Sequence, residues 1–287
     1  MAARLKYIPL FLVLIAFIAC NSKSKPAAAG SAASNVAQTQ ATPFQKLKQF
    51  MDGSWVVSDY IKSLAKTRSP YSSSGEFGMV AAMDIGLPAG VSDSTHVGYS
   101  LNNHEGGNFI IYNKPGQRPN TLKTNLPEGP SNGDFYELGY SAKNNDTTLI
   151  LYRYKKNKRL ANSISYTKVI TLDNNNAAGG IEYITNKTLF SGTYSIADTA
   201  KNLEVKLSDN GKITGLSDFK TYLVNTDFVA GPENNLDVII FDWGTKKQKS
   251  YAFTFNKDTL NMYETREAAD SINLVIDKLK YKLVKHK

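Results

Sequence analysis

The chain has 287 residues, a formal net charge of +9 at neutral pH and a single cysteine. One cysteine excludes an intrachain disulfide framework, so a folded part of this size must be stabilised by burial of apolar side chains. The basic balance favours contact with anionic surfaces, and the export signal described next argues against nucleic acid as a partner.

The N-terminus has the pattern of an export signal. Arg4 and Lys6 precede an apolar run from Ile8 to Ala19. This run is too short to span a bilayer, and together with the basic start it is typical of a secretory signal peptide over residues 1–19.

The only cysteine follows this run directly. Phe17-Ile18-Ala19-Cys20 resembles the bacterial lipobox. The resemblance implies that Cys20 is diacylated on its sulfur, with chains such as palmitate, and that a lipid anchor holds the protein at a membrane of the bacterial cell envelope. Asn21 stands where some bacteria read aspartate as an inner-membrane retention signal, which favours the outer membrane. The alternative is an ordinary signal peptide whose removal leaves a free thiol.

The segment after the cysteine has the composition of a tether. Residues 21–42 are rich in Ala, Ser, Gln and Asn and contain no aromatic residue. Such a segment cannot bury enough apolar surface to offset the entropy of ordering it. We therefore expect the lipidated Cys20 and a flexible linker over residues 20–42.

Beyond residue 42, the sequence is typical of β structure with little helix. Aromatic residues make up 11% of the chain, and turn-forming Asn, Gly and Asp clusters separate the apolar runs. Phe44, Leu47, Phe50 and Met51 recur at helical spacing and predict a short helix. Residues 264–276 predict a second short helix, with a strand as the alternative for the end of that stretch.

Four short motifs recur in the same order in two halves of this region, which predicts an internal repeat of two units, residues 43–175 and 188–287. The pairs are Gly53-Ser54-Trp55 with Gly192-Thr193-Tyr194, Phe109–Asn113 with Val238–Asp242, Asp146–Leu149 with Asp258–Leu260, and Tyr166–Val169 with Tyr281–Val284.

Strand patterns are clearest in the second unit. Leu203–Leu207 and Lys278–Leu283 alternate apolar and charged residues, which predicts strands with one buried and one wet face. Asp209-Asn210-Gly211 supplies a tight hairpin turn. Val238–Phe241 is apolar at every position, which predicts a strand covered on both faces.

A short helix, then Gly-x-Trp, then hairpins ending in a Tyr-x-Leu strand resemble the lipocalin-like (calycin-type) domains of bacterial lipoproteins. The resemblance rests on Gly53-Ser54-Trp55 in the first unit. In the second unit it rests on Gly192-Thr193-Tyr194, the Gly211-Lys212-Ile213 turn, Asp258-Thr259-Leu260 and Tyr281-Lys282-Leu283. It implies a mainly β fold, an antiparallel meander barrel or sandwich, with a structural role for Trp55. The second unit is small for a full barrel, so an incomplete barrel or one larger shared sheet are alternatives.

Few residues suggest chemistry. His96 and His104 flank an expected hairpin and would need Glu105 or Asp93 to complete a metal site, but the spacing is typical of a surface turn. The sequence contains no nucleophile elbow, zinc-helix motif or phosphate-binding loop. We therefore expect a non-enzymatic protein with no catalytic residue, metal or cofactor; a hydrolase built on His104, Glu105 and a serine is the alternative.

Two surface features suggest binding. A basic cluster at an expected hairpin tip predicts either attachment to an anionic glycolipid or membrane phosphate, or a solvated turn. A long loop between Asn113 and Asp134 predicts either a lid or a surface insertion, with Arg118, Tyr112 and Phe135 nearest to any pocket beneath it. The cluster consists of Arg153, Lys155, Lys156, Lys158 and Arg159.

Together these features predict a protein that binds a small apolar or amphipathic ligand in a barrel mouth or at the seam between the units. The alternative is a structural or adaptor lipoprotein that binds an envelope protein through its β units.

Overall fold

The computed structural model describes residues 50–87, 93–101, 103–126, 133–143, 146–170, 177–197, 203–229, 234–270 and 272–286. These residues all belong to one compact unit, Ala41–Lys287. The predicted signal peptide, Cys20, the linker, and Phe44 and Leu47 of the predicted first helix lie outside the described residues. Within the described ranges, no helix is both long and apolar enough to cross a membrane.

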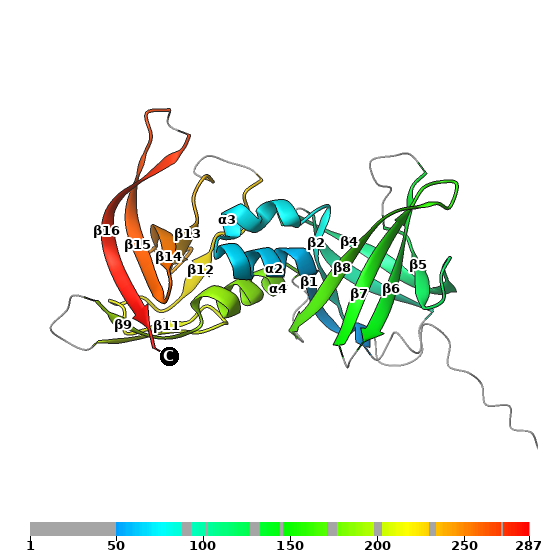
Figure 1. Cartoon of the computed structure of the whole chain (residues 1–287), viewed down its shortest axis with the longest axis horizontal. Coiled ribbons are helices and arrows are strands. Elements are labelled where there is room, and N and C mark those ends of the chain that lie inside the picture. Colours follow the sequence, from blue (N-terminus) through cyan, green and yellow to red (C-terminus); the bar gives the residue numbers. More distant parts are fainter. Residues whose placement is uncertain are drawn as a thin grey trace, which may run out of the picture. The chain divides into compact units, whose positions relative to one another are not determined.

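The first sheet is a closed barrel of eight antiparallel strands, in which each strand pairs with the next and the last returns to the first (Figure 1). This arrangement confirms the predicted meander barrel. The strands are β1 (Gly53–Val57), β2 (Val80–Ile85), β3 (Ser94–Leu101), β4 (Glu105–Pro115), β5 (Thr121–Thr124), β6 (Phe135–Lys143), β7 (Asp146–Tyr154) and β8 (Leu160–Ile170).

The second sheet also has eight antiparallel strands, in the order β11-β10-β9-β16-β15-β14-β13-β12. The last strand again pairs with the first, and only one bridge, Lys212 to Thr221, links β11 to β12. The sheet is therefore barrel-like and almost closed. Its strands are β9 (Gly192–Ile196), β10 (Glu204–Leu207), β11 (Ile213–Thr214), β12 (Tyr222–Val224), β13 (Val238–Phe241), β14 (Lys249–Asn256), β15 (Thr259–Glu267) and β16 (Leu274–Lys285).

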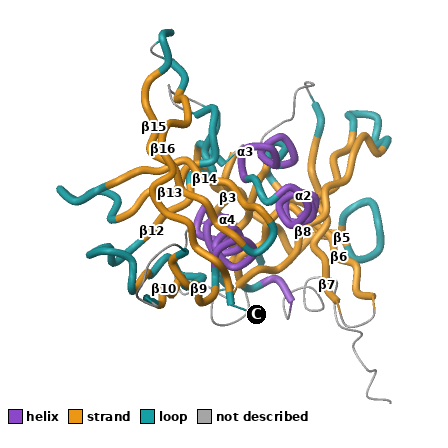
Figure 2. Tube along the Cα trace, turned by 60° about the vertical axis from the view of Figure 1, so that its left-hand side comes forward, coloured by secondary structure: helices purple, strands orange, loops and turns teal. Residues whose placement is uncertain are grey.

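Short helices follow the first and last strands of the barrel. Helices α2 (Ser58–Thr67), α3 (Pro70–Ser73) and the 3-10 turn η1 (Ser74–Glu76) come after β1, and α4 (Ala177–Thr185) with the π-helical turn η2 (Asn186–Phe190) leads into β9. Figure 2 shows α2, α3 and α4 gathered together in purple. The Tyr60 hydroxyl of α2 lies 2.9 Å from the Thr185 hydroxyl of α4, and both groups are buried.

Helix α4 packs against the outside of the barrel. It contacts β1, β2, β3 and β8. Gly180 makes this close approach feasible, because a Cβ there would lie 3.1 Å from the Cβ of Ser54 and 3.5 Å from Val56. The glycine therefore sets how closely the helix lies on the sheet.

Large apolar side chains fill the interior of both sheets. In the barrel, Trp55, Met83, Phe109, Leu138 and Tyr166 are each at most 1% exposed. The second sheet contributes a matching set to the same hydrophobic core: Ile239, Phe241, Phe253, Leu260 and Met262. Burial of side chains of this size supplies the stabilisation that the missing disulfides do not.

Strand pairing tests the predicted repeat directly, and two of the four motif pairs occupy equivalent places. Trp55 and Tyr194 each stand third in the first strand of their sheet. Leu149 of β7 pairs with Tyr166 of β8, as Leu260 of β15 pairs with Leu283 of β16.

The pairing of Leu260 with Leu283 shows that the fourth motif pair, Tyr166–Val169 with Tyr281–Val284, was aligned two residues out of place. Tyr166 lies opposite Val57 and Leu283 lies opposite Ile196, so the counterpart of Tyr166 is Leu283 and not Tyr281. Alternating strands look alike when shifted by two residues, because such a shift leaves every side chain on the same face.

The second motif pair is wrong. Phe109–Asn113 belongs to β4, the fourth strand of its sheet, whereas Val238–Phe241 is β13, the fifth. Both segments are apolar β-rich runs, and composition alone does not distinguish neighbouring strands.

Two secondary-structure predictions also need correction. Residues 264–276 are the end of β15, a turn and the start of β16, with no helix among their described residues. The predicted long loop after Asn113 contains the strand β5. The other predicted strands are confirmed, and burial alternates along Glu204–Leu207 as expected, but Leu279 on the predicted buried face of Lys278–Leu283 is 51% exposed.

Candidate functional site

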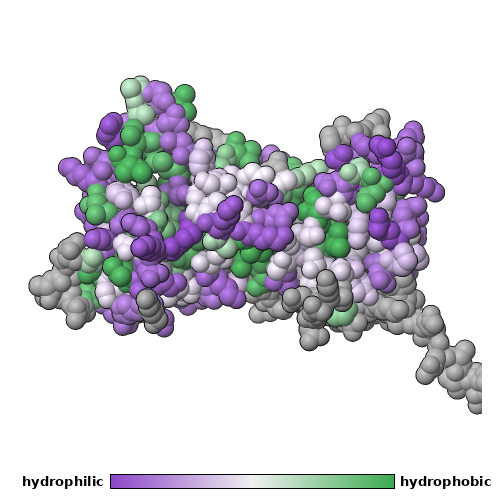
Figure 3. Space-filling model, in the orientation of Figure 1, coloured by the Kyte–Doolittle hydropathy of each residue, from purple (hydrophilic) through white to green (hydrophobic). Residues whose placement is uncertain are grey.

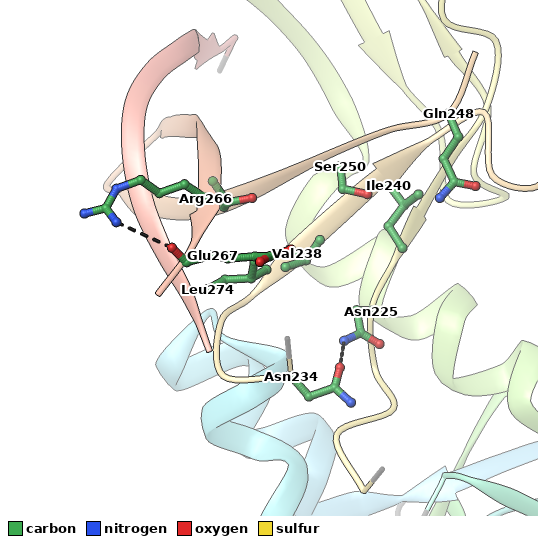
Figure 4. Close-up of a pocket in the computed structure, with 10 residues that line it drawn as sticks. Asn225, Asn234, Val238, Ile240, Gln248, Ser250, Arg266, Glu267 and Leu274 are labelled. Carbon is green, nitrogen blue, oxygen red and sulfur yellow. Dashed lines mark hydrogen bonds between the residues drawn. The ribbon is translucent and has the colours of Figure 1, made fainter. Parts of the chain in front are cut away.

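A pocket of about 670 Å³ lies beside the hairpin formed by β15 and β16 (Figure 4). One wall consists of Val238 and Ile240 of β13 and Ser250 of β14. Ile239, Phe241, Tyr251 and Phe253, which alternate with them, belong to the hydrophobic core. Because neighbouring side chains of a strand point to opposite faces, the pocket opens on the face of the sheet turned away from the core. The full lining is Asn225, Asn234, Val238, Ile240, Gln248, Ser250, Thr265, Arg266, Glu267 and Leu274.

The pocket exists because β15 leaves β14 before its end. Tyr263 is the last residue of β15 that pairs with β14, opposite Ala252. The register of β15 against β16 shifts on either side of Tyr263, and such irregularities bend a strand. The segment Thr265–Glu267 therefore becomes a second wall rather than a continuation of the sheet.

Asn235 fixes the far end of the hairpin. Its side-chain amide donates to the Leu274 carbonyl at 2.9 Å and accepts from the Leu274 amide at 2.8 Å. One side chain thus satisfies both backbone groups of a residue near the start of β16, as a neighbouring strand would. This clamp holds Leu274 at the rim of the pocket before any ligand binds.

The lining combines hydrogen-bonding groups with an apolar wall. Asn225 donates to Asn234 at 3.2 Å, and the guanidinium of Arg266 lies 3.5 Å from the Glu267 carbonyl (Figure 4). Gln248 and Ser250 are exposed, whereas Val238 is buried and Ile240 half-buried. Arg266 and Glu267 are the two charged residues of the lining, and the Arg266 side chain extends away from Val238 and Ile240 (Figure 4). The mixed polar and apolar lining suits an amphipathic molecule.

A smaller pocket, about 270 Å³, lies where the turn after α3 meets the segment before β13. Phe77 and Gly78 face Thr226 and Phe228 there. Contacts around it are specific: the Asn103 amide donates to the Thr226 carbonyl at 2.6 Å, and the Tyr71 and Phe228 rings meet edge to face at 5.3 Å.

His96 and His104 have different surroundings. Among the described residues, no group of three His, Cys, Asp or Glu side chains is arranged to hold a metal ion. His96 lies within β3, and His104 lies in the turn to β4, where its Nδ1 is 2.7 Å from the Asp227 carboxylate. That hydrogen bond raises the pKa of His104 above its usual value. In the alternative hydrolase site, the hydrogen-bond partner of His104 is therefore Asp227 and not Glu105.

The predicted basic cluster is partly neutralised. It lies at the β7–β8 turn as expected, but Arg153 and Lys155 both reach the buried carboxylate of Asp134, at 3.2 and 3.4 Å. Lys156, Lys158 and Arg159 remain exposed in the turn.

Two of the three residues predicted near the long loop come together. Arg118 donates to the Tyr154 hydroxyl at 3.2 Å and lies over the Tyr152 ring at 5.1 Å, and Phe135 stacks on Tyr154 at 5.3 Å. Tyr112, on β4, lies apart from this group, and the Lys114 amine is 5.8 Å from the centre of its ring. The three aromatic rings and Arg118 thus form one cluster where β6 begins and β7 ends.

Sequence reasoning missed the pocket beside the hairpin. Its lining residues come from four strands, the connection between β12 and β13, and the end of the β13–β14 turn, and none forms a recognisable motif. The one signal in the sequence is the length of the last strand. Leu274–Tyr281 precedes the residues of β16 that pair with β9, so this part of the strand is not needed to close the second sheet.

These features define an antiparallel β protein of two eight-stranded sheets, one closed and one almost closed, with a mixed polar and apolar pocket on the second. No family model, curated protein or solved structure matches the chain.

Proposed function

We propose that this protein is a non-enzymatic, lipid-anchored binding protein of the bacterial envelope that holds a small amphipathic ligand in the pocket beside the β15–β16 hairpin. The pocket itself is the observation that supports the proposal. Its volume of about 670 Å³ lies within the range of small-molecule sites.

The lining favours an amphipathic ligand over a purely apolar one. The NH2 group of Gln248 and the Ser250 hydroxyl offer hydrogen bonds to a polar head, while Val238 and Ile240 offer a wall to a short apolar part. A long acyl chain would find too little apolar surface there. The Asn235 clamp reduces the entropy cost of binding, because the hairpin is already held in place.

Native mass spectrometry of the mature protein purified from its own host tests this proposal. We expect a discrete added mass that disappears on denaturation. Ser250→Trp should abolish it by filling the pocket, whereas Thr254→Trp, the same bulky residue further along β14 on the same exposed face, should leave it unchanged. Equal loss in both variants, or retention in Ser250→Trp, would place the ligand elsewhere.

The anchor is supported by the sequence alone. The lipobox-like string ending at Cys20, together with Asn21, suggests acylation and the outer membrane. Cys20→Ser should abolish metabolic labelling with palmitate and release the protein from the membrane fraction. A Cys20→Ser protein that stays membrane-bound would contradict a lipid anchor.

We also propose that the two sheets descend from one lipocalin-like unit by duplication. The shared strand order and the equivalent places of Trp55 and Tyr194 support this origin. A related chain with one unit, in which the third residue of the first strand is aromatic, would strengthen it; two unrelated single-unit relatives would contradict it.

An adaptor role is the second candidate, supported by apolar side chains at the hairpin. Ile272, Ile276 and Leu279 are 60%, 40% and 51% exposed, and apolar surface appears over β15 and β16 amid hydrophilic residues (Figure 3). If these residues bind an envelope protein, Ile276→Ser combined with Leu279→Ser should abolish a specific crosslinked product in cells. The matched exposed change Val229→Ser should preserve it. An unchanged product in the double variant would remove this candidate.

A further inference from the structure

The turn between β13 and β14 presents the most exposed aromatic side chain among the described residues. Trp243 is 61% exposed, whereas Trp55, the other tryptophan of the chain, is fully buried. An exposed tryptophan leaves a large apolar ring in contact with water. The exposure of Trp243 on a turn therefore indicates a surface that binds something.

The turn is held rigidly. Asp242 adopts a left-handed conformation at φ 49°, and its carboxylate accepts the backbone amides of Lys220 and Thr221 at 2.9 and 3.0 Å. The Thr245 amide and hydroxyl both donate to the Asp242 carbonyl, and the Gly244 amide donates to Gln248 at 2.9 Å. Trp243 is therefore displayed by a pre-organised loop and not by a loose one.

Four lysines lie on or beside this turn. Lys246, Lys247 and Lys249 follow it within six residues, and Lys220 is brought beside the turn through its backbone bond to Asp242. All four side chains are exposed, and none forms an ion pair with a carboxylate of the described residues. The one acidic side chain of the turn, Asp242, is occupied with backbone amides.

We propose that this turn is a membrane contact, in which Trp243 enters the headgroup region of a bilayer and the four lysines bind its anionic phosphates. An indole ring is suited to that depth because its body is apolar and its N–H polar, and lysines near an anionic surface add long-range attraction. The positive charge of the turn favours an anionic lipid surface, because a neutral bilayer offers the lysines no anionic partner. The contact adjoins the ligand pocket, since Gln248 both lines the pocket and accepts from Gly244 of the turn, and it does not involve Cys20.

The test uses the full chain carrying Cys20→Ser, so that acyl chains contribute nothing, and Trp55→Phe, so that Trp243 is the only tryptophan. Vesicles of phosphatidylethanolamine with phosphatidylglycerol serve as the anionic probe, and phosphatidylcholine vesicles as the neutral one. We expect anionic vesicles to shift Trp243 emission to the blue and brominated lipid to quench it. Binding should fall at least about tenfold when salt is raised to about 0.5 M, because screening weakens phosphate contacts.

Variants locate the contact. Lys246→Gln, Lys247→Gln and Lys249→Gln together should weaken binding at least about tenfold. The matched triple change Lys278→Gln, Lys280→Gln and Lys282→Gln on β16 should weaken it far less. Equal loss in both triple variants, binding that leaves Trp243 unquenched, or equal binding to neutral vesicles would overturn the proposal. Circular dichroism of each variant checks that the fold is retained.

Discussion

Trp55 and Tyr194 make the same interactions in different sheets. The Trp55 indole donates to the Met51 carbonyl at 2.7 Å, and the Tyr194 hydroxyl donates to the Phe190 carbonyl at 2.6 Å, each four residues back. Lysines of the last strands, Lys168 and Lys285, pair opposite them and place their amines 5.8 Å from the two ring centres. Each aromatic residue thus ties the turn before its first strand to the strand that closes the sheet.

This role predicts a measurable cost when the hydrogen bond is lost. Tyr194→Phe should lower the free energy of unfolding by about 1–2 kcal/mol, because the buried Phe190 carbonyl loses its partner. Trp55→Phe should cost more, about 2–4 kcal/mol, since it also removes volume from the core. Urea denaturation measures both. Tyr71→Phe, which removes a hydroxyl from a 44% exposed ring, is the control and should change stability by less than about 0.5 kcal/mol.

The His104–Asp227 pair predicts a pH dependence. Its hydrogen bond raises the pKa of His104 in the folded state, so the pair stabilises the fold fully below the unfolded value of about 6.5 and loses this contribution as pH rises through the folded pKa. Asp227→Asn should therefore lower the urea midpoint more at about pH 5.5 than at about pH 8.5. In a His104→Gln background this difference should vanish. A larger effect at the higher pH would contradict the assignment.

The second sheet should unfold together with the barrel. Contacts outside either sheet interior join them: Asn103 donates to Thr226, the Arg68 guanidinium lies 4.1 Å from the Phe255 ring centre, and the Tyr71 amide donates to Asp237 at 2.7 Å.

Trp55 fluorescence in a Trp243→Phe chain reports on the barrel alone and tests this coupling. Leu260→Ala, a buried change in β15, should destabilise the fold by about 2–5 kcal/mol and lower the urea midpoint that Trp55 reports. If Leu260→Ala leaves the urea midpoint reported by Trp55 fluorescence unchanged, the two sheets unfold independently.

Helix α4 depends on a glycine for its packing. Gly180→Leu should destabilise the protein by about 1–3 kcal/mol, because the new side chain would meet Ser54 and the barrel wall. Gly75→Leu is the matched change at a glycine whose Cβ would meet nothing within 4 Å, and it should be close to neutral. Thermal unfolding compares the two, and similar losses would mean that α4 does not pack closely on β1.

The sequence predicted the strands better than it predicted their register. Alternation in Glu204–Leu207 and the turn at Gly211 are local signals, since side-chain direction and a φ of 76° depend on neighbouring residues. The misplaced match between β4 and β13 shows the limit: an apolar run identifies a strand but not its place in a sheet. Residues 264–276 were open to a helix because their pattern lacks the strict period of either structure.

The candidate site could not be predicted from the sequence, and the reason is physical. It depends on where β15 leaves β14 and on the Asn235 clamp, and both join residues far apart in the chain. The basic cluster at the β7–β8 turn shows the converse problem. The charges were visible in the sequence, but the buried Asp134 that binds Arg153 and Lys155 could be identified only from the fold.

The most direct test of the account is a crystal structure of the mature protein taken from its host envelope with no ligand added. We predict connected density for a small molecule between Ile240 and Arg266, with its polar end near Asn225 and Gln248. Density for ordered water alone in that pocket, with a bound molecule inside the barrel of β1–β8 instead, would contradict it.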